Sequence, residues 1–243
     1  MALRSPPIPR PKLSDEIAGY LRDQIISGKL RPGQRIVLDA VARQLGVSRM
    51  PVRDAVLTLS HEGLTEVRPR RGVVVAPMSR QDLLDAYLVH AVVAGLVVER
   101  AVPNLSAAEL TQLERLHDQM AQLGPENTVR LEQLNWEFHR TLNQASRSRK
   151  LAWLLRTLTR TVPHHFYHLI PNWAAIAHEH HGQLLAALQA RDAALARACA
   201  ERHVQTGGTM LVDYLERRGY WRSASDRHLA GQGDGHHPGT RPA

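Results

Sequence analysis

Residues 45–64 read LGVSRMPVRDAVLTLSHEGL and carry the clearest local structural signal in the chain. Apolar side chains recur along this stretch at helical spacing and share one helix face; they are Val52, Val56 and Leu59. Arg49 and Arg53 lie on the opposite edge, near the start of the helix. The pattern predicts a helix that buries one side and exposes two arginines on the other.

The residues before this helix predict a tight turn from an earlier one. Val41–Leu45 has helical apolar spacing, Gly46 permits the turn, and Ser48 can cap the second helix through its hydroxyl group. Pro51 falls in the first turn, where its missing N–H costs nothing. Such a pair of helices is typical of a helix-turn-helix, whose second helix enters the major groove of DNA. An ordinary helical hairpin is the alternative that the turn alone leaves open.

A predicted hairpin follows the helix pair. Leu64–Val67 and Val73–Ala76 are short β-rich runs, and the arginine-rich segment 68–72 separates them. This arrangement is typical of a wing, whose Arg70 and Arg71 would lie against the DNA backbone or reach the minor groove. A solvated charged loop is the simpler interpretation, but it would have to coincide with a helix-turn-helix immediately upstream.

The segment before the helix pair predicts three further elements. Apolar spacing predicts a helix over Leu13–Ile26, and Ile36–Leu38 is short and apolar enough for a small strand. Asp39 is predicted to cap a helix over Ala40–Leu45. Residues 1–11 are rich in proline and predict a disordered arm, so the DNA-binding domain is expected over 12–77.

Charge is distributed unevenly along the chain, whose net charge is +8. Residues 1–77 hold 13 Lys and Arg against 7 Asp and Glu, whereas the remainder holds 18 against 16. A basic first third is typical of a nucleic-acid-binding module. The single cysteine, Cys199, excludes an intrachain disulfide framework and fits a reducing cytoplasm. We find no signal peptide and no uninterrupted apolar run of about 18–20 residues, so we expect a cytoplasmic protein without membrane segments.

Residues 79–221 show helical periodicity and no strand alternation. This pattern predicts a mainly α protein with a C-terminal antiparallel helical bundle. The six expected helices cover about 80–101, 106–121, 126–145, 148–168, 173–190 and 192–219. Residues 222–243 are rich in glycine and predict a disordered tail.

Four residues of the predicted bundle have the spacing of a metal site. Asn135 and His139 are four residues apart, so they project from one helix face. His181 and His203 are each about 11 residues from a predicted turn at 190–192, which brings them level on two antiparallel helices. Three imidazoles and an amide oxygen can bind a divalent transition metal. Hydrogen-bonded core histidines are the alternative interpretation.

The N-terminal part resembles the winged helix of the GntR superfamily of bacterial transcription regulators. The resemblance rests on IISGKLRPGQRI (25–36), LGVSRMPVRDAV (45–56), HEGL (61–64) and RRGVVV (70–75). It implies that Arg49 and Arg53 contact double-stranded operator DNA, and that Gly72 lets the wing tip approach DNA closely. The predicted DNA-binding residues are Ser48, Arg49, Arg53, Arg70, Arg71 and Gly72. Asp39 replaces an arginine or other polar residue common in the family, so we leave it out of this set.

The C-terminal part resembles the FCD ligand-binding domain of the FadR branch of this superfamily. NWEFHRTL (135–142) and HHGQLLAALQARDAALARACAERHV (180–204) carry the resemblance, and six helices rather than seven are similar to the VanR-type subgroup. The family's metal site, occupied by zinc, nickel or manganese, implies the ligands Asn135, His139, His181 and His203. Asn135 departs from the usual aspartate and removes a negative charge.

The effector pocket implied by this resemblance also departs from the family. His90 and Ala94 occupy the positions where carboxylate sensors carry an arginine and a glutamate. Without the guanidinium, the ligand is expected to be less acidic, or to meet the metal and histidines alone. His165 and His168 are further pocket candidates, with surface exposure as the equal alternative. His178 and His180 are candidates for the surface or for support around the metal ligands.

The resemblance implies a homodimeric transcription regulator that represses a metabolic operon and is released by a small metabolite, for example a carboxylate. A metal-sensing regulator, in which the ion is the signal, is the main alternative. A histidine-metal hydrolase is a weaker one, because Glu137 lies off the metal-facing side of its helix and no other carboxylate has the spacing of a general base. We therefore do not expect an enzyme.

Overall fold

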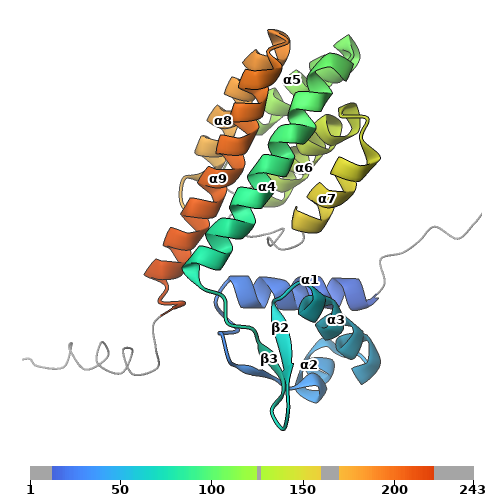
Figure 1. Ribbon diagram of the computed structural model, residues 1–243, viewed down its shortest axis with the longest axis vertical. Coiled ribbons are helices and arrows are strands. Elements are labelled where there is room, and N and C mark those ends of the chain that lie inside the picture. The colour runs from blue at the N-terminus through green and yellow to red at the C-terminus, as the bar shows by residue number, and fades with distance from the viewer. Residues whose placement is uncertain (1–12, 125–126, 160–169, 222–243) are drawn as a thin grey trace, which may run out of the picture.

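The computed structural model describes residues 13–124, 127–159 and 170–221, which form an N-terminal head and a helical domain (Figure 1). The head contains three helices and a small sheet. Its elements in chain order are α1 (Leu13–Ile26), β1 (Arg35–Ile36), α2 (Leu38–Leu45), α3 (Arg49–His61), β2 (Thr65–Arg68) and β3 (Gly72–Val75). The predicted winged helix-turn-helix is therefore confirmed.

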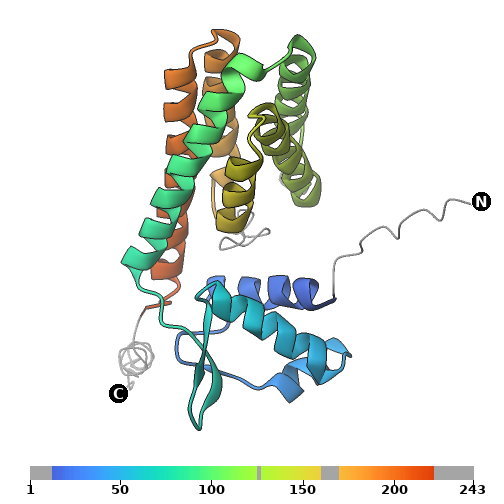
Figure 2. The same cartoon turned by 45° about the vertical axis from the view of Figure 1, so that its right-hand side comes forward.

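The sheet has the strand order β1-β3-β2, and both pairings are antiparallel. Val67 pairs with Val73 and Arg68 with Gly72, so the hairpin closes where the sequence predicted it. Its tip points away from the helical domain (Figure 2). Arg70 and Gly72 take positive φ angles of 63° and 71°, which form the tight tip. The short strand predicted at Ile36–Leu38 is β1, which covers Arg35–Ile36 and so begins one residue before its predicted start.

The core of the head forms where the apolar face of α3 meets α1. Val52, Val56 and Leu59 are buried as predicted, and α1 contributes its own buried aliphatic side chains, among them Leu21 and Ile25. Each fully buried aliphatic side chain contributes roughly 1.5–3 kcal/mol relative to an exposed one. The same core fixes α3 with its arginines outward.

Two predicted helix caps are wrong in detail. The helix α2 begins at Leu38 with Val37 at its N-cap, so Asp39 lies inside the first turn instead of capping Ala40. Ser48 does occupy the N-cap of α3 with extended backbone, but its side chain makes no capping hydrogen bond. Gly46 ends α2 in the left-handed region, at φ 66°, as the predicted turn requires.

The helical domain follows the predicted bundle closely. Its helices are α4 (Arg80–Ala101), α5 (Ala107–Ala121), α6 (Thr128–Ala145), α7 (Arg149–Thr159), α8 (Trp173–Gln189) and α9 (Ala193–Arg217), with a 3-10 turn η1 (Val102–Asn104) after α4. Ser79 and Ser106 form capping boxes with Asp82 and Glu109, which fix the starts of α4 and α5. The helix predicted to reach residue 168 is described only to Thr159.

The long helices α4 and α9 pack closely along their length (Figure 1). A Cβ atom added to Gly208 of α9 would lie 2.4 Å from Cγ of Tyr87 on α4, so only glycine fits there. Within the described part of the chain, the segment Arg80–Asn104 alone has the length and mean hydropathy (1.5) of a membrane span, which the sequence analysis did not anticipate. Tyr87 and other apolar residues of α4 pack into the protein core instead.

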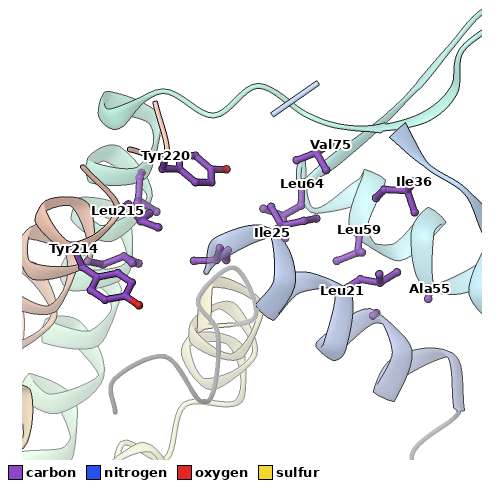
Figure 3. Close-up of a cluster of buried hydrophobic side chains, with 14 of the residues drawn as sticks. Leu21, Ile25, Ile36, Ala55, Leu59, Leu64, Val75, Tyr214, Leu215 and Tyr220 are labelled. Atoms are coloured by element: carbon purple, nitrogen blue, oxygen red, sulfur yellow. The ribbon is translucent and has the colours of Figure 1, made fainter. Parts of the chain in front are cut away.

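The end of α9 contacts the head. Leu215 and Tyr220 belong to the same buried apolar cluster as Ile25 of α1, as Figure 3 shows. The Tyr220 ring lies 3.1 Å from the position of a Cβ added to Gly28. Nearby, the indole N–H of Trp221 donates a 2.8 Å hydrogen bond to the carbonyl oxygen of Met78, the residue just before α4. The helical domain therefore holds the head through the end of α9 and the residues that follow it.

Candidate functional site

The first candidate surface lies on the head. Arg49 and Arg53 are exposed at the start of α3, on the side opposite its buried face. Ser48 is exposed beside them. The Arg49 guanidinium lies 3.4 Å from a carboxylate oxygen of Asp39, and both side chains are more than half exposed, at 65% and 60%. Such an exposed ion pair contributes only about 0–1 kcal/mol, so the arginine remains available to another partner.

The wing supplies the second half of this surface. Arg70, Arg71 and Gly72 are all exposed at the tip of the hairpin. A helix N-terminus with exposed arginines beside a basic hairpin is the arrangement by which winged helices contact major-groove base edges and the flanking backbone. The structure therefore places all six residues of the predicted DNA-binding set on the outside of the head.

The second candidate site is a group of histidines inside the helical domain. His139 of α6, His181 of α8 and His203 of α9 offer ligand nitrogens that all lie within 4.8 Å of one another. His181 and His203 are buried, and their ring centroids are 4.8 Å apart. The structure therefore brings together the three histidines that the sequence placed level. We call them the histidine triad.

The histidine triad is short of hydrogen-bond partners. Neither ring nitrogen of His181 has a partner among the described residues, and the same holds for Nδ1 of His203. A neutral imidazole carries one hydrogen-bond donor and one acceptor. Leaving a buried donor or acceptor without a hydrogen bond costs about 1–3 kcal/mol. Buried polar atoms without partners call for an explanation, and a ligand that binds them supplies one. The donor set fits a divalent transition metal.

Burial also sets the charge of these side chains. Burial, together with the neighbouring His90, lowers the pKa of His139 to about 4. Burial is the main cause of the lowered pKa of His181 and His203 as well, followed by the like charges of other histidines. The imidazoles are therefore neutral at pH 7, which is the form that binds metal ions.

His90 faces the histidine triad from α4. Its electrostatic influence reaches both His139 and His203, and burial lowers its own pKa to about 4. Its Nδ1 atom is buried without a partner in the described structure. Asn135 is half-buried on α6, one turn before His139. His165 and His168, the other predicted pocket residues, lie outside the described residues.

Aromatic neighbours support the triad. Phe138 stacks on His181 with ring centroids 4.5 Å apart, and the Trp173 ring lies 5.4 Å from that of His203. The sequence analysis did not single out these two residues, because an aromatic residue beside a histidine has no periodic signature. His180, a predicted supporting residue, places its ring 5.8 Å from that of His203.

A further histidine pair was missed in part. His117 of α5 stacks on His178 of α8 with ring centroids 3.9 Å apart, and its Nε2 lies 3.1 Å from the carbonyl oxygen of His178. The sequence analysis named only His178. No spacing rule could have found His117, because the contact joins residues 61 positions apart.

Known proteins share both parts of this architecture. Residues 13–75 match the model described as "Bacterial regulatory proteins, gntR family", and residues 85–206 match the FCD domain. The repressor RspR of Escherichia coli is 27% identical over 203 residues, which cover 81% of this chain and 88% of RspR. The regulator McbR of Escherichia coli is 27% identical over 210 residues, which cover 84% of this chain and 95% of McbR.

A solved structure agrees. The structure of E. coli McbR/YncC superposes with a TM-score of 0.63 at 25% identity and covers 84% of this chain and 99% of that one. The gntR family model and the relatives RspR and McbR describe transcription regulators, so the expectation that the protein is not an enzyme is confirmed. The chain belongs to the gntR family of bacterial regulatory proteins and carries an FCD domain behind its winged helix-turn-helix, which makes it a DNA-binding transcription regulator.

Proposed function

We propose that the protein is a homodimeric, cytoplasmic repressor of a metabolic operon that leaves its operator when a small molecule binds in the helical domain at a metal held by the histidine triad. The observation that carries the proposal is the triad itself. It is a group of neutral imidazoles inside the domain on which the DNA-binding head rests, and among the described residues both ring nitrogens of His181 and Nδ1 of His203 are buried without a hydrogen-bond partner. Repression is named for the relative RspR, and six described helices are in keeping with a VanR-type FCD domain.

The DNA contact is assigned to the exposed face of the head. Arg49 and Arg53 would enter the major groove, and the wing residues Arg70 and Arg71 would contact the backbone. Two heads related by a two-fold axis would bind successive half-sites of a near-palindromic operator. The exposed apolar residues Leu88, Val89 and Val92 follow one another along α4 and suit a self-complementary contact between two copies.

The metal is assigned to His139, His181 and His203, with the amide oxygen of Asn135 as the fourth protein ligand. Zinc, nickel and manganese are the candidates, and the bound ion would supply a Lewis-acidic position for an oxygen of the effector. His90 would orient the effector through its ring nitrogen. A carboxylate or related metabolite without need of a guanidinium fits this lining.

The route from effector to DNA follows α9. This helix carries His203 and leads directly to Leu215 and Tyr220, which contact the head. An effector that draws His203 toward the other triad members would change the position of the end of α9, and so the separation of the two heads. Release requires that the effector bind more tightly to the DNA-incompetent state.

Operator binding is tested with Arg49→Ala and Arg53→Ala in a gel-shift titration at fixed salt. Each variant should lose about 1–3 kcal/mol of operator binding while it keeps its fold, because each removes a base or phosphate contact. Arg217→Ala, an exposed arginine at the end of α9, serves as the matched control and should bind normally. Unchanged affinity of both head variants would refute the assignment.

The metal is tested by elemental analysis of purified wild type, His139→Ala and His203→Ala. Wild type should hold near-stoichiometric metal, and both variants should lose it. A metal-sensing regulator remains the second candidate, because three buried nitrogens of His181 and His203 have no hydrogen-bond partner among the described residues and a metal alone could occupy the triad. In that case chelation alone would change operator affinity, whereas a metabolite sensor would respond to the metabolite with its metal in place.

A further inference from the structure

The charges around the histidine triad are unusual for a cation site. Among the described residues, the ligand atoms gathered within 4.8 Å of one another belong to His139, His181 and His203, and no carboxylate is part of this group. A carboxylate does lie beside a more exposed histidine of the same domain: an Asp118 oxygen is 3.9 Å from Nδ1 of His117. The acidic groups therefore stop short of the triad.

We infer that the triad holds a divalent metal tightly only together with a small anion, so that metal and anion binding depend on each other. The inference rests on the proposed metal site and names how that site is regulated. Its physical cause is charge. Three neutral imidazoles and the amide of Asn135 leave the full double charge of the ion uncompensated in a buried pocket.

An anion that ligates the metal would restore the balance. Opposite charges attract far more strongly in a buried site than in water, so the first anionic oxygen contributes a large part of the binding free energy. The neutral His90 ring, whose Nδ1 is buried without a described partner, can donate a hydrogen bond to that anion in one of its tautomers. The predicted ligand class is a small monoanion with carboxylate oxygens.

Asn135 is the residue that creates this dependence. An aspartate at the same position would supply one negative charge from the protein, and the metal would then need no partner from solution. Glu137 cannot take this role, because it lies two residues before His139 and points off the triad-facing side of α6. Asn135→Asp is therefore a nearly isosteric change that should remove the anion dependence.

The test measures zinc affinity of the full-length protein by competition with a chromophoric chelator at pH 7. Ionic strength is held constant with weakly coordinating perchlorate, and acetate is compared with its neutral analogue acetamide. For the wild type, saturating acetate should lower the apparent Kd for zinc about tenfold or more, within the usual range of coupling between two sites. Acetamide should leave it unchanged. For Asn135→Asp, zinc should bind tightly in both solutions, with less than about a twofold difference.

The possible results distinguish a failure of the anion dependence from a failure of the metal site itself. Equal zinc affinity of the wild type in acetate and acetamide would overturn the anion dependence while leaving the metal site intact; hydroxide bound in place of acetate would give this result. An equal response of wild type and Asn135→Asp would also overturn it, because Asn135 would not be the cause. No zinc binding by either protein in either solution would overturn the metal site itself. His139→Gln, at a half-buried position, should bind zinc in none of these conditions.

Discussion

The head and the helical domain both bury polar side chains, but the two regions differ in whether these side chains have hydrogen-bond partners. In the head, the Arg22 guanidinium donates two hydrogen bonds to the Glu62 carboxylate, at 2.8 and 2.9 Å, and both side chains are largely buried. In the helical domain, His181 is buried with neither ring nitrogen paired in the described structure. The buried charge of the head is therefore paired within the protein, whereas the buried imidazole of His181 has unpaired nitrogens that a ligand could bind.

The difference follows from where each region meets its partner. DNA is too large to enter a fold, so the head presents its arginines outside a core that is complete without them. The proposed small effector would be enclosed, so it requires polar groups that are left unpaired inside the helical domain. Stability is therefore expected to be lowered locally at the histidine triad, as is common for binding sites.

The largest expected effect comes from breaking the buried Arg22–Glu62 ion pair of the head. Glu62→Ala leaves the buried Arg22 charge without a partner and should lower the free energy of unfolding by about 3–5 kcal/mol. Chemical denaturation followed by circular dichroism measures the change. Asp39→Ala, which removes the exposed pair with Arg49, is the control and should cost less than about 1 kcal/mol. A similar small loss for Glu62→Ala would mean that water reaches Arg22.

The stability of the helical domain should depend on pH. The pKa values of His90 and His139 fall to about 4 in the fold, from an ordinary value of 6.5. The unfolded chain then binds more protons between these values, so the chelated protein should lose stability as pH falls from about 6.5 to about 4. The slope is about 1.4 kcal/mol per pH unit for each such histidine.

Thermal unfolding of the chelated protein across this range, at constant ionic strength, measures that slope. His90→Gln removes one of the buried histidines that titrate on unfolding while it keeps a polar side chain, so its slope should be shallower. An identical pH dependence of wild type and His90→Gln would show that His90 is not held neutral by burial.

Replacing a buried histidine of the triad with an apolar side chain should stabilise the metal-free protein. His181→Leu removes two unpaired nitrogens from a site stacked on Phe138, and should raise the unfolding free energy of the metal-free protein by about 1–3 kcal/mol. The same variant should lose metal. His61→Leu, at an exposed position, is the control and should change stability by less than about 0.5 kcal/mol. A large loss of stability in His181→Leu would show that the imidazole already has a partner.

The smallest expected effect concerns the outside of the head. Asp39→Asn removes a negative charge beside Arg49 and beside the approaching phosphates, so operator affinity should rise by a few tenths to about 1 kcal/mol at low salt. The gain should fade as salt is raised, which a fluorescence-anisotropy titration at several salt concentrations can follow. Weaker binding would mean that Asp39 itself contacts a base, such as the amino group of cytosine.

Local patterns explain how much could be predicted. Val52, Val56 and Leu59 recur at helical spacing, so the sequence predicted both α3 and its buried side. The level positions of His181 and His203 followed from their equal distance to one turn. The helices of the bundle agreed to within a few residues where the structure describes them, because the capping serines Ser79 and Ser106 and prolines such as Pro103 and Pro171 mark boundaries in the sequence.

What was missed depends on contacts between distant residues. Asp39 looked like a helix cap, but Val37 takes the cap position because the backbone leaves β1 directly into α2. The stacking of His117 on His178 and the contact of Tyr220 with Gly28 join residues far apart in sequence. No local spacing encodes such contacts.

The close approach of α4 and α9 also constrains how this protein can change over evolutionary time. Because a Cβ at position 208 would overlap the Tyr87 ring, a larger residue at 208 is acceptable only if position 87 becomes smaller. Relatives that keep this helix pair should therefore exchange the two residues together, one large and one small. In each relative, the position with the larger residue then shows which of the two helices supplies the side chain at this contact. The two positions should therefore covary when many relatives are compared.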